Sequence, residues 1–445
     1  MASETFGAQL AGACPLHFNF HDKSGESRKR IISKVGGRKM QIFDPGDNDV
    51  HWEIYRKFLQ VDPKIGVVGS DLPSVKWVVL QTPLKSSDAC FTKEDVYATE
   101  NMKLPEVDPD DTGASILTFG STGLPKAVQY SHHRGYPSVA LVRGGKLITQ
   151  QNTLLFPSIA KAMEYTSSII EEARPKIAVI VVPFLMELLM TEDVSWKIPT
   201  VFTGGQPVPA SCLSAIGKRC DALLVLYGST ETSFTAGRLY TSPNDKCIGL
   251  SPLPGVEIKI VGKNVMTVPL GTKGEVLTRS CLPFPGYINE VEKTAVVITP
   301  VGWYKTDDFG QINSSCYLEV FGRVSDVMEI PGAKVLPSFL EEIIKRNLGV
   351  KEVVVFSIKD EVHADDIPCA AVVKKDGMTL TEESLKDFIK QELNVSEEAI
   401  FMEYKYLNSF SVNLFDTDKG IGQINPYKDA QRVWCSTKSL VFEKY

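Results

Sequence analysis

One stretch of thirteen residues, Ile116 to Val128, constrains the fold of this chain more than any other. It reads Ile-Leu-Thr-Phe-Gly-Ser-Thr-Gly-Leu-Pro-Lys-Ala-Val, so apolar residues give way to glycines, hydroxyl side chains, a proline and a lysine before apolar residues return. This order predicts a buried strand followed by a tight loop. Glycines allow backbone N–H groups to converge on an anion, and hydroxyls and an ammonium add donors, so the loop suits phosphate. An ordinary Gly/Ser-rich turn with a surface lysine is the alternative interpretation.

Two later segments repeat the plan of an apolar run that ends in a glycine turn. They are residues 199–205 and 222–228, and a helix is predicted between them from Ala210 to Arg219. Alternating strands and helices predict a doubly wound parallel sheet in an α/β fold, whose ligands bind at the carboxyl ends of the strands. The loop after Leu117 and both glycine turns fall at such ends. This agreement favours a nucleotide site.

The pattern of elements divides the chain into three regions. Residues 1–50 are an N-terminal segment of uncertain structure, in which the basic run 23–39 is expected to be solvated surface, with targeting or membrane binding as the alternative. Residues 51–325 are predicted to form a large domain whose part from 241 to 325 is β-rich, and residues 326–445 a small C-terminal α+β lid domain.

Other elements follow from hydrophobic periodicity. Ile65–Gly69 and Val75–Leu80 are predicted strands of a buried parallel sheet. Further predicted helices are 161–173, 184–190, 337–346 and 382–393, and further predicted strands are 177–183, 256–261, 274–278, 317–321, 353–356 and 370–373.

Composition and charge argue against several classes of protein. A length of 445 residues suffices for two or more domains, and a net charge of −6 disfavours general nucleic-acid binding. The nine cysteines show no Cys-x-x-Cys spacing, which predicts reduced thiols rather than a zinc site or a disulfide framework. The most apolar segment, residues 177–190, is too short to span a bilayer. No secretory signal or peroxisomal tripeptide is recognised, so the expected location is the cytoplasm.

Five further motifs follow the loop in order. They are Thr203-Gly204-Gly205-Gln206-Pro207, Tyr227-Gly228-Ser229-Thr230-Glu231, Gly274-Glu275-Val276 with Gly286-Tyr287, Tyr304-Lys305-Thr306-Asp307-Asp308, and Gly322-Arg323-Val324-Ser325-Asp326. Together with the loop, this ordered series resembles the signatures of the adenylate-forming (ANL) superfamily, which includes acyl-CoA synthetases, beetle luciferases and the adenylation domains of peptide synthetases. The resemblance covers roughly residues 60 to 430.

The resemblance implies an ATP-dependent carboxylate–CoA ligase of the acyl-CoA synthetase type, as in fatty acid metabolism. Such an enzyme forms an acyl-adenylate with release of pyrophosphate and then a thioester with CoA. The implied ligands are therefore ATP/AMP, Mg²⁺, CoA as co-substrate and a small-molecule carboxylate, with no nucleic acid. Because charge builds on the phosphate oxygens, catalysis would consist mostly of placement and charge neutralisation.

The same resemblance implies roles for particular residues. The implied set is Ser121, Thr122 and Lys126 for the β- and γ-phosphates, Thr230 for the α-phosphate, Glu231 for Mg²⁺, Tyr227 for adenine, Asp308 and Arg323 for the ribose, and Thr118, Gly120, Gly123, Gly204, Gly205 and Gly228 for the remaining nucleotide contacts. Lys126, Thr230 and Glu231 are the implied catalytic residues, and Asp326 matches the hinge of the C-terminal domain. Taken alone, Asp308 and Arg323 are equally consistent with a surface ion pair.

The chain departs from the superfamily pattern at several positions. The departures are Phe119 in place of a small hydroxyl residue, Asp307 in place of Gly, Glu329 in place of Lys, Phe339 in place of Glu, and Gln423 in place of the lysine that enters the site during adenylation. The Pro-x-x-His-x-x-Gly motif that lines the acyl pocket has no counterpart. Loss of one pre-organised donor typically lowers a rate about a hundred- to a thousand-fold, so Gln423 matters most. Lys419 is a candidate substitute.

Two hypotheses of different class remain. In the first, the chain is a working ligase, which the retained lysine, glutamate, aspartate and arginine of the implied site favour. In the second, it is a catalytically degenerate pseudoenzyme that binds a nucleotide, an acyl group or a protein partner, which Gln423 and the missing acyl-pocket motif favour. A plain P-loop NTPase is disfavoured because the Walker A spacing is absent.

Overall fold

A computed structural model of the chain describes residues 13–17, 26–36, 40–43, 50–57, 59–62, 66–71, 75–80, 84, 91–92, 106–118, 125–132, 154–155, 168, 170–190, 195–245, 248–330, 333–359, 366–375, 377–395 and 411–415. The chain divides into two compact units. The first comprises Met1–Ile258 and Thr278–Lys305, and the second comprises Lys259–Leu277 and Thr306–Tyr445. Among the helices of the described residues, none has the length and apolar character needed to cross a membrane.

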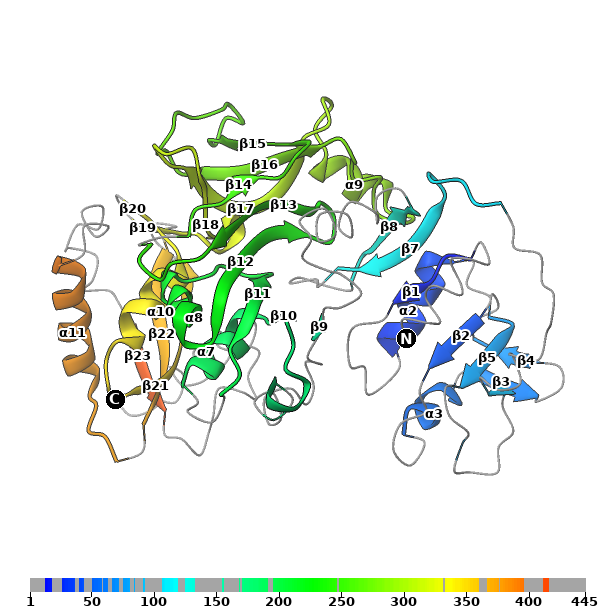
Figure 1. The fold of residues 1–445 in the computed structure, drawn as a ribbon, viewed down its shortest axis with the longest axis horizontal. Helices are drawn as coiled ribbons and strands as arrows, with labels where there is room; N and C mark the ends of the chain where they lie inside the picture. The colour runs from blue at the N-terminus through cyan, green and yellow to red at the C-terminus, as the bar shows by residue number, and fades with distance from the viewer. Residues whose placement is uncertain are drawn as a thin grey trace, which may run out of the picture. The chain divides into compact units, whose positions relative to one another are not determined.

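The N-terminal part of the first unit contains two small sheets (Figure 1). The elements are β2 (Met40–Phe43), α3 (Val50–Tyr55), β3 (Leu59–Asp62), β4 (Gly66–Ser70), β5 (Trp77–Leu80) and β6 (Phe91–Thr92). Strands β2, β5 and β6 are parallel, as predicted for Val75–Leu80. The prediction for Ile65–Gly69 is wrong, because β4 pairs antiparallel with β3. Only residues 63–65 separate these strands, and so short a connection permits only an antiparallel hairpin.

The predicted loop-bearing strand lies in a three-stranded sheet of order β1-β7-β8. The elements here are β1 (Leu16–His17), α2 (Glu26–Val35), β7 (Thr112–Leu117) and β8 (Ala127–Ser131). Helix α2 packs on the β7–β8 hairpin, since Ile31 and Val35 share one buried cluster with Leu117 and Ala127. The Asn289 side-chain amide donates hydrogen bonds to the last two carbonyls of α2. The described N-terminal elements therefore brace the hairpin that carries the predicted phosphate loop.

A six-stranded mixed sheet lies in the first unit, in the order β14-β13-β12-β11-β10-β9 (Figure 1). Its elements and their helices are β9 (Leu154–Leu155), β10 (Ile177–Val179), α7 (Val182–Met190), β11 (Ile198–Gly204), η2 (Ala210–Ser214), α8 (Ala215–Lys218), β12 (Cys220–Ser229), β13 (Ser233–Tyr240) and β14 (Ser251–Pro252). Strands β9 to β12 are parallel, whereas β13 and β14 add antiparallel strands. Helix α7 packs on β11 and α8 on β12, and Leu185, Leu213 and Leu223 are fully buried. The predicted α/β fold with parallel strands is confirmed.

The helix predicted from Ala210 to Arg219 is wrong in part. A 3₁₀-helix, η2, leads into the four-residue α8, which is interrupted at Ile216 and Gly217. The φ angle of Gly217 is 87°, a left-handed conformation that breaks the helical hydrogen-bond ladder and that glycine adopts without a side-chain penalty. Apolar periodicity therefore located the buried segment but not its backbone conformation.

Strands dominate the next part of the chain. A four-stranded sheet has the order β15-β16-β17-β18. Its strands are β15 (Val256–Val261), β16 (Gly274–Ser280), β17 (Tyr304–Ile312) and β18 (Leu318–Arg323), and α9 (Val291–Val297) lies between β16 and β17 in sequence. Strands β17 and β18 are antiparallel, and Asp308 is directly opposite Arg323. Strand register thus pairs the two predicted ribose-binding residues.

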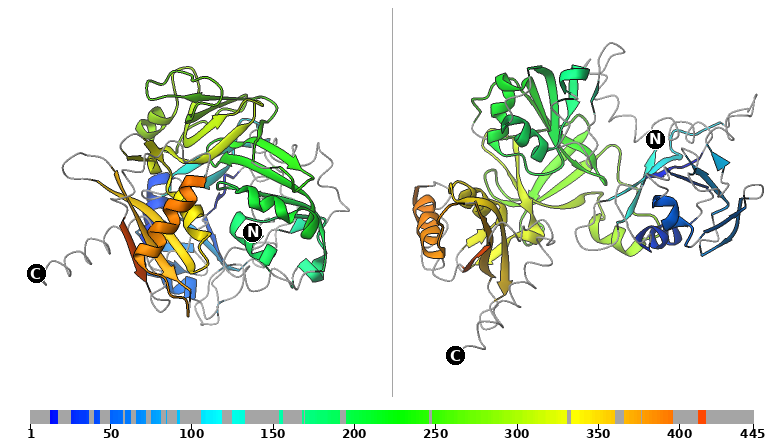
Figure 2. Two further views of the ribbon diagram at one scale, coloured as in Figure 1. Left: turned by 90° about the vertical axis from the view of Figure 1, so that its left-hand side faces the viewer. Right: turned by 90° about the horizontal axis from the view of Figure 1, so that it is seen from below.

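In the C-terminal part of the second unit, helices pack on a sheet (Figure 2). The elements are η3 (Val324–Asp326), β19 (Met328–Ile330), β20 (Ala333–Val335), α10 (Pro337–Lys345), β21 (Val350–Lys359), β22 (Asp366–Lys374), α11 (Glu382–Val395) and β23 (Ser411–Phe415). Leu340 and Ile343 of α10 join Leu385 and Ile389 of α11 in one buried cluster with Val355 of β21. The helices and strands predicted between residues 337 and 393 are confirmed.

Glu341 of α10 gives a pH-dependent test of this packing. Its Oε1 accepts a hydrogen bond from the Val355 N–H at 2.9 Å. Burial raises the pKa of the Glu341 carboxyl above its usual value, although the Val355 bond and Lys345 act in the opposite direction. An acid with a raised folded-state pKa is harder to ionise in the folded than in the unfolded protein, so it lowers stability as pH rises through that pKa.

Glu341→Gln is therefore expected to raise the free energy of unfolding at pH 7, because glutamine keeps an acceptor for Val355 without a charge. The gain should shrink below the reference pKa of 4.5, where the glutamate of the natural chain is protonated in both states. Urea unfolding at pH 7 and near pH 4 measures the difference. An equal gain at both pH values would contradict the assignment to ionisation.

Candidate functional site

The two ends of the predicted phosphate loop are tied together. Thr118 is buried, and its N–H donates to the carbonyl of Lys126 at 2.8 Å. In return, the N–H of Lys126 donates to Thr118 Oγ1 at 3.1 Å. This reciprocal pair closes the hairpin and sets the point from which the Lys126 side chain extends. Residues 119–124, which include Phe119 and the predicted ligands Gly120, Ser121, Thr122 and Gly123, lie outside the described residues.

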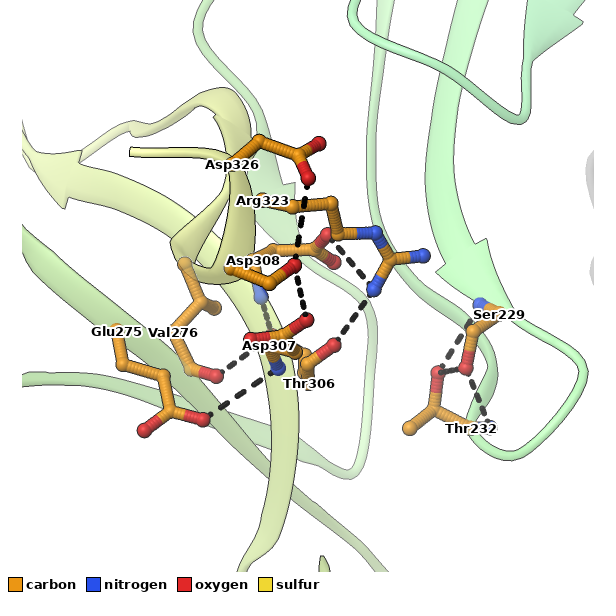
Figure 3. Close-up of polar contacts among 10 residues, drawn as sticks. Ser229, Thr232, Glu275, Val276, Thr306, Asp307, Asp308, Arg323 and Asp326 are labelled. Carbon is orange, nitrogen blue, oxygen red and sulfur yellow. Dashed lines mark hydrogen bonds and ion pairs between the residues drawn. The ribbon is translucent and has the colours of Figure 1, made fainter. Parts of the chain in front are cut away.

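The turn between β12 and β13 carries Thr230 and Glu231. Ser229 and Thr232 hold the turn, because the Ser229 N–H donates to Thr232 Oγ1 at 3.1 Å and the Thr232 N–H donates to Ser229 Oγ at 3.2 Å (Figure 3). Gly228 lies at a β-bulge, where the Cβ of any other residue would collide with a backbone carbonyl of β13. The sequence thus builds a tightly bonded turn, on which Glu231 is only 8% exposed.

Three segments that are distant in sequence meet at Tyr287. The Tyr287 hydroxyl donates to Glu231 Oε1 at 2.7 Å. The Lys126 ammonium donates to the same hydroxyl oxygen at 3.3 Å and lies 4.3 Å from the ring centroid. Tyr130 of β8 donates its hydroxyl to the Thr230 carbonyl, which fastens the turn to the hairpin. A tyrosine therefore joins the predicted phosphate-binding lysine to the predicted metal-binding glutamate.

The glycine turn after β11 lies at the carboxyl end of a parallel strand. Gly204 pairs with β12, and Gly205 has a φ angle of 82°, in the left-handed region. Thr203 is 4% exposed, and its hydroxyl has no hydrogen-bond partner among the described residues. A buried hydroxyl without a partner is costly, so a polar ligand at this strand end fits the site. Tyr227, on the neighbouring strand, is half-buried, and its carbonyl accepts a hydrogen bond from Thr235.

In the second unit, Asp308 and Arg323 form an ion pair across β17 and β18 (Figure 3). Arg323 Nη1 lies 3.2 Å from Asp308 Oδ1 and donates to the Thr306 carbonyl at 2.8 Å. The Asp308 N–H donates to Thr306 Oγ1 at 3.0 Å. The side chain of Asp308 is 13% exposed and that of Arg323 is 51% exposed. The limited exposure and fixed orientation of Asp308 make the pair more than an ordinary surface ion pair.

Asp307 takes a backbone conformation that explains why the superfamily pattern has glycine there. Its φ angle is 59°, in the left-handed region that glycine adopts freely and that Asp tolerates better than most residues. Asp307 Oδ2 accepts a hydrogen bond from the Ser325 hydroxyl at 2.9 Å. Desolvation and the Asp307 carboxylate raise the pKa of Asp326, the predicted hinge residue, against the opposing charge of Arg323. The departure from glycine thus keeps the turn and adds a carboxylate.

The side chains around Tyr287 fit a metal-bound polyphosphate. Mg²⁺ in phosphate sites is usually held by one or two carboxylates together with the phosphates, so a single buried Glu231 is sufficient on the protein side. Lys126 supplies a compact positive charge for the phosphate oxygens. Within the described residues, no group of three or more His, Cys, Asp or Glu side chains is arranged to hold a metal ion.

Comparison with known proteins identifies relatives of one kind. A sequence model of the AMP-binding enzyme family matches residues 136–288. The Bacillus subtilis protein YdaB is 28% identical over 399 residues, which cover 79% of this chain and 77% of YdaB. 4-Coumarate–CoA ligase 4 of Arabidopsis thaliana is 24% identical over 351 residues, which cover 69% of this chain and 61% of the ligase. In sequence, the chain is similar to AMP-binding enzymes of the adenylate-forming superfamily.

Solved structures of adenylate-forming enzymes share the fold of this chain. The amide bond synthetase McbA of Marinactinospora thermotolerans matches with a TM-score of 0.68 at 20% identity, covering 92% of this chain and 82% of McbA. The anthranilate–CoA ligase AuaEII, solved with anthranoyl-AMP, matches with a TM-score of 0.72 at 18% identity, covering 93% and 81%. At these identities the likeness concerns the fold, and it confirms the predicted fold class. The chain spans less than two thirds of the length of the Arabidopsis ligase.

Two departures from the superfamily pattern are accommodated by contacts within the second unit. Glu329, in place of lysine, forms an ion pair with Lys263 at 3.0 Å. Phe339, in place of glutamate, packs against the buried cluster of α10 and α11. Gln423 and Lys419 lie outside the described residues.

Sequence reasoning missed the contacts of two tyrosines. Tyr287 was recognised only as part of the Gly286-Tyr287 motif, and no role was predicted for Tyr130. Their partners lie 56 and 100 residues away along the chain, so no local spacing reveals the contacts. The position of Tyr287 within the ordered motif series was the available signal.

Proposed function

We propose that this chain is an ATP-dependent carboxylate–CoA ligase of the acyl- or aryl-CoA ligase class. It would bind ATP with Mg²⁺, activate a small-molecule carboxylate as its acyl-adenylate and transfer the acyl group to CoA. The names of its relatives support this class, since they include 4-coumarate–CoA ligases of Arabidopsis thaliana and Humulus lupulus and a CoA ligase of Rhodococcus jostii. Structural neighbours include MatB with ATP and MenE with AMP.

The observation that carries the proposal is the cluster of Lys126, Tyr287 and Glu231. A carboxylate that is 8% exposed normally pairs with a cation or accepts strong hydrogen bonds. Here it accepts one from the Tyr287 hydroxyl, whose oxygen also accepts one from the Lys126 ammonium. One buried carboxylate and one ammonium in the same cluster match the needs of a metal-bound triphosphate.

The chain's own residues would divide the adenylation step between them. Lys126 would neutralise charge on the β- and γ-phosphates, and Thr230 would donate a hydrogen bond to the α-phosphate. A carboxylate oxygen of the substrate attacks the α-phosphorus, and pyrophosphate leaves with its electron pair. Bound Mg²⁺ would add charge neutralisation on the phosphates. Asp308 would accept hydrogen bonds from the ribose hydroxyls, with Arg323 fixing its orientation.

The second step would be thioester formation. The CoA sulfur, as a thiolate, attacks the acyl carbon of the acyl-adenylate, and AMP leaves. We propose that the C-terminal segment 326–445 serves as the lid domain in which this superfamily changes conformation between steps, with Asp326 as the hinge. Limited proteolysis with and without ATP and CoA would test this role, because a moving lid changes which bonds are accessible.

A second candidate function is binding of a nucleotide, an acyl group or a protein partner without turnover. Gln423 favours it, because glutamine carries no charge where the superfamily has lysine. Glu329 also favours it, because it places a negative charge where the superfamily has a positive one. This carboxylate is paired with Lys263 at 3.0 Å.

Calorimetric titration with ATP and Mg²⁺, beside a pyrophosphate-release assay over fatty and aromatic acids, tests the two candidates. The proposal predicts ATP binding, and pyrophosphate release with at least one acid. Gln423→Lys is expected to raise the release rate by about a hundred-fold if the lost lysine limits adenylation. Binding with release only in Gln423→Lys would support the second candidate. Failure of the natural chain to bind ATP would refute the ligase.

A further inference from the structure

Tyr287 is anchored at its backbone and at its ring. Its backbone forms an antiparallel bridge with Val128 of β8, and its N–H donates to Thr294 Oγ1 at 3.0 Å. The ring packs edge-on against Phe284, with ring centroids 4.9 Å apart, and the residue is 6% exposed. The position of the Tyr287 hydroxyl is therefore set by the surrounding fold and does not depend on a ligand.

The Tyr287 side chain contacts two different charged groups. Its hydroxyl donates to Glu231 Oε1 at 2.7 Å, while its oxygen accepts a hydrogen bond from the Lys126 ammonium at 3.3 Å. A hydroxyl that accepts a bond from a cation is polarised and becomes a better donor to a carboxylate. The ring lies beneath the ammonium at 4.3 Å, a cation–π contact that does not involve the hydroxyl. The ring and the hydroxyl thus have separable effects.

We infer that Tyr287 is a positioning residue that orients Glu231 for Mg²⁺ bound with ATP. This inference rests on the proposed function and adds a residue to its site. A glutamate side chain loses conformational entropy when it is fixed, and the anchored phenol fixes it before the nucleotide arrives. Tyr287 acts through Glu231 and makes no contact with the reacting atoms. Its contribution should be confined to the part of ATP binding that depends on Mg²⁺.

Tyr287→Phe separates the hydroxyl from the ring. Phenylalanine keeps the ring contacts with Phe284 and Lys126 and removes the hydroxyl, and with it the hydrogen bond to Glu231 and the longer one from the Lys126 ammonium. Calorimetric titrations with ATP, once with Mg²⁺ and once with EDTA, give the factor by which Mg²⁺ strengthens ATP binding. We expect Tyr287→Phe to lower this magnesium factor about 2- to 10-fold, the usual effect of one hydrogen bond. Metal-free ATP binding should stay within about 2-fold.

Tyr240→Phe is a matched control for the loss of a buried tyrosine hydroxyl. Tyr240 is 1% exposed, and its hydroxyl donates to the Gly249 carbonyl at 2.6 Å. This variant is expected to lower the thermal unfolding temperature and to leave the magnesium factor unchanged. Equal losses of the magnesium factor in Tyr287→Phe and Tyr240→Phe would assign the effect to stability and overturn the inference.

A double variant tests whether Tyr287 acts through Glu231. Glu231→Gln should remove most of the magnesium factor, and adding Tyr287→Phe should then have no further effect on it. A further loss in the double variant would overturn the inference. An unchanged magnesium factor in Tyr287→Phe, with ATP binding intact, would overturn the inference alone. No ATP binding by the natural chain would overturn the proposed function and, with it, the inference.

Discussion

Glu231→Gln is expected to slow pyrophosphate release about 100- to 1,000-fold. Glutamine preserves the size of this 8% exposed side chain and keeps an oxygen that can accept the Tyr287 hydrogen bond. It removes the negative charge, which a hard oxygen ligand needs to hold Mg²⁺ firmly. Because the shape and the hydrogen bond remain, the loss should fall on the rate and on the magnesium requirement, while the free energy of unfolding changes little.

The measurement is the initial rate of pyrophosphate release against Mg²⁺ concentration, with an acid that the natural chain accepts. Glu292→Gln, at an exposed position in the first turn of α9, is the matched control and should stay within about 2-fold of the natural chain. High Mg²⁺ should recover part of the lost rate in Glu231→Gln if the defect is metal affinity. A Glu231→Gln protein as fast as the control would exclude Glu231 as the metal ligand.

Local sequence patterns predicted where single helices and strands lie along the chain. The apolar run before the phosphate loop ends where β7 ends, at Leu117, and the amphipathic segment after Pro337 forms α10. Strand pairing was less predictable. Ile65–Gly69 has the composition of a buried parallel strand, but its pairing is decided by the nearby strand β3, which precedes it by three residues, 63–65.

Motif spacing identified candidate site residues but not the contacts that hold them. The Tyr-Gly-x-Thr-Glu motif identified Glu231, yet its bond to Tyr287 depends on the folding of segments 56 residues apart. Asp307 is a second example, in which the sequence does not reveal the backbone conformation. In the sequence it is a change from glycine to a carboxylate residue, and only its φ angle of 59° shows that the left-handed turn conformation is retained. The residue type at one position does not by itself determine the backbone conformation there.

Asp308→Asn is expected to weaken ATP binding about 10- to 100-fold, the usual range for hydrogen bonds to a charged group. Asparagine keeps the shape of a side chain that is 13% exposed, and the backbone bond from residue 308 to Thr306 does not involve the changed group. The ion pair with Arg323 at 3.2 Å is lost, and with it the force that orients the side chain. The remaining amide has only one oxygen to offer the two ribose hydroxyls.

Titration with ATP and with 2′,3′-dideoxy-ATP separates ribose recognition from a general effect on the β17–β18 pair. The natural chain should prefer ATP, and Asp308→Asn should lose most of that preference because the two nucleotides differ only in the hydroxyls. Asp307→Asn is the matched control, since asparagine also tolerates the left-handed backbone and can still accept the Ser325 hydrogen bond. If Asp308→Asn weakens both nucleotides equally, Asp308 supports the strand pair with Arg323 and does not contact the ribose. A lost preference in Asp308→Asn, with the preference intact in Asp307→Asn, assigns ribose recognition to the less exposed of the two neighbouring carboxylates.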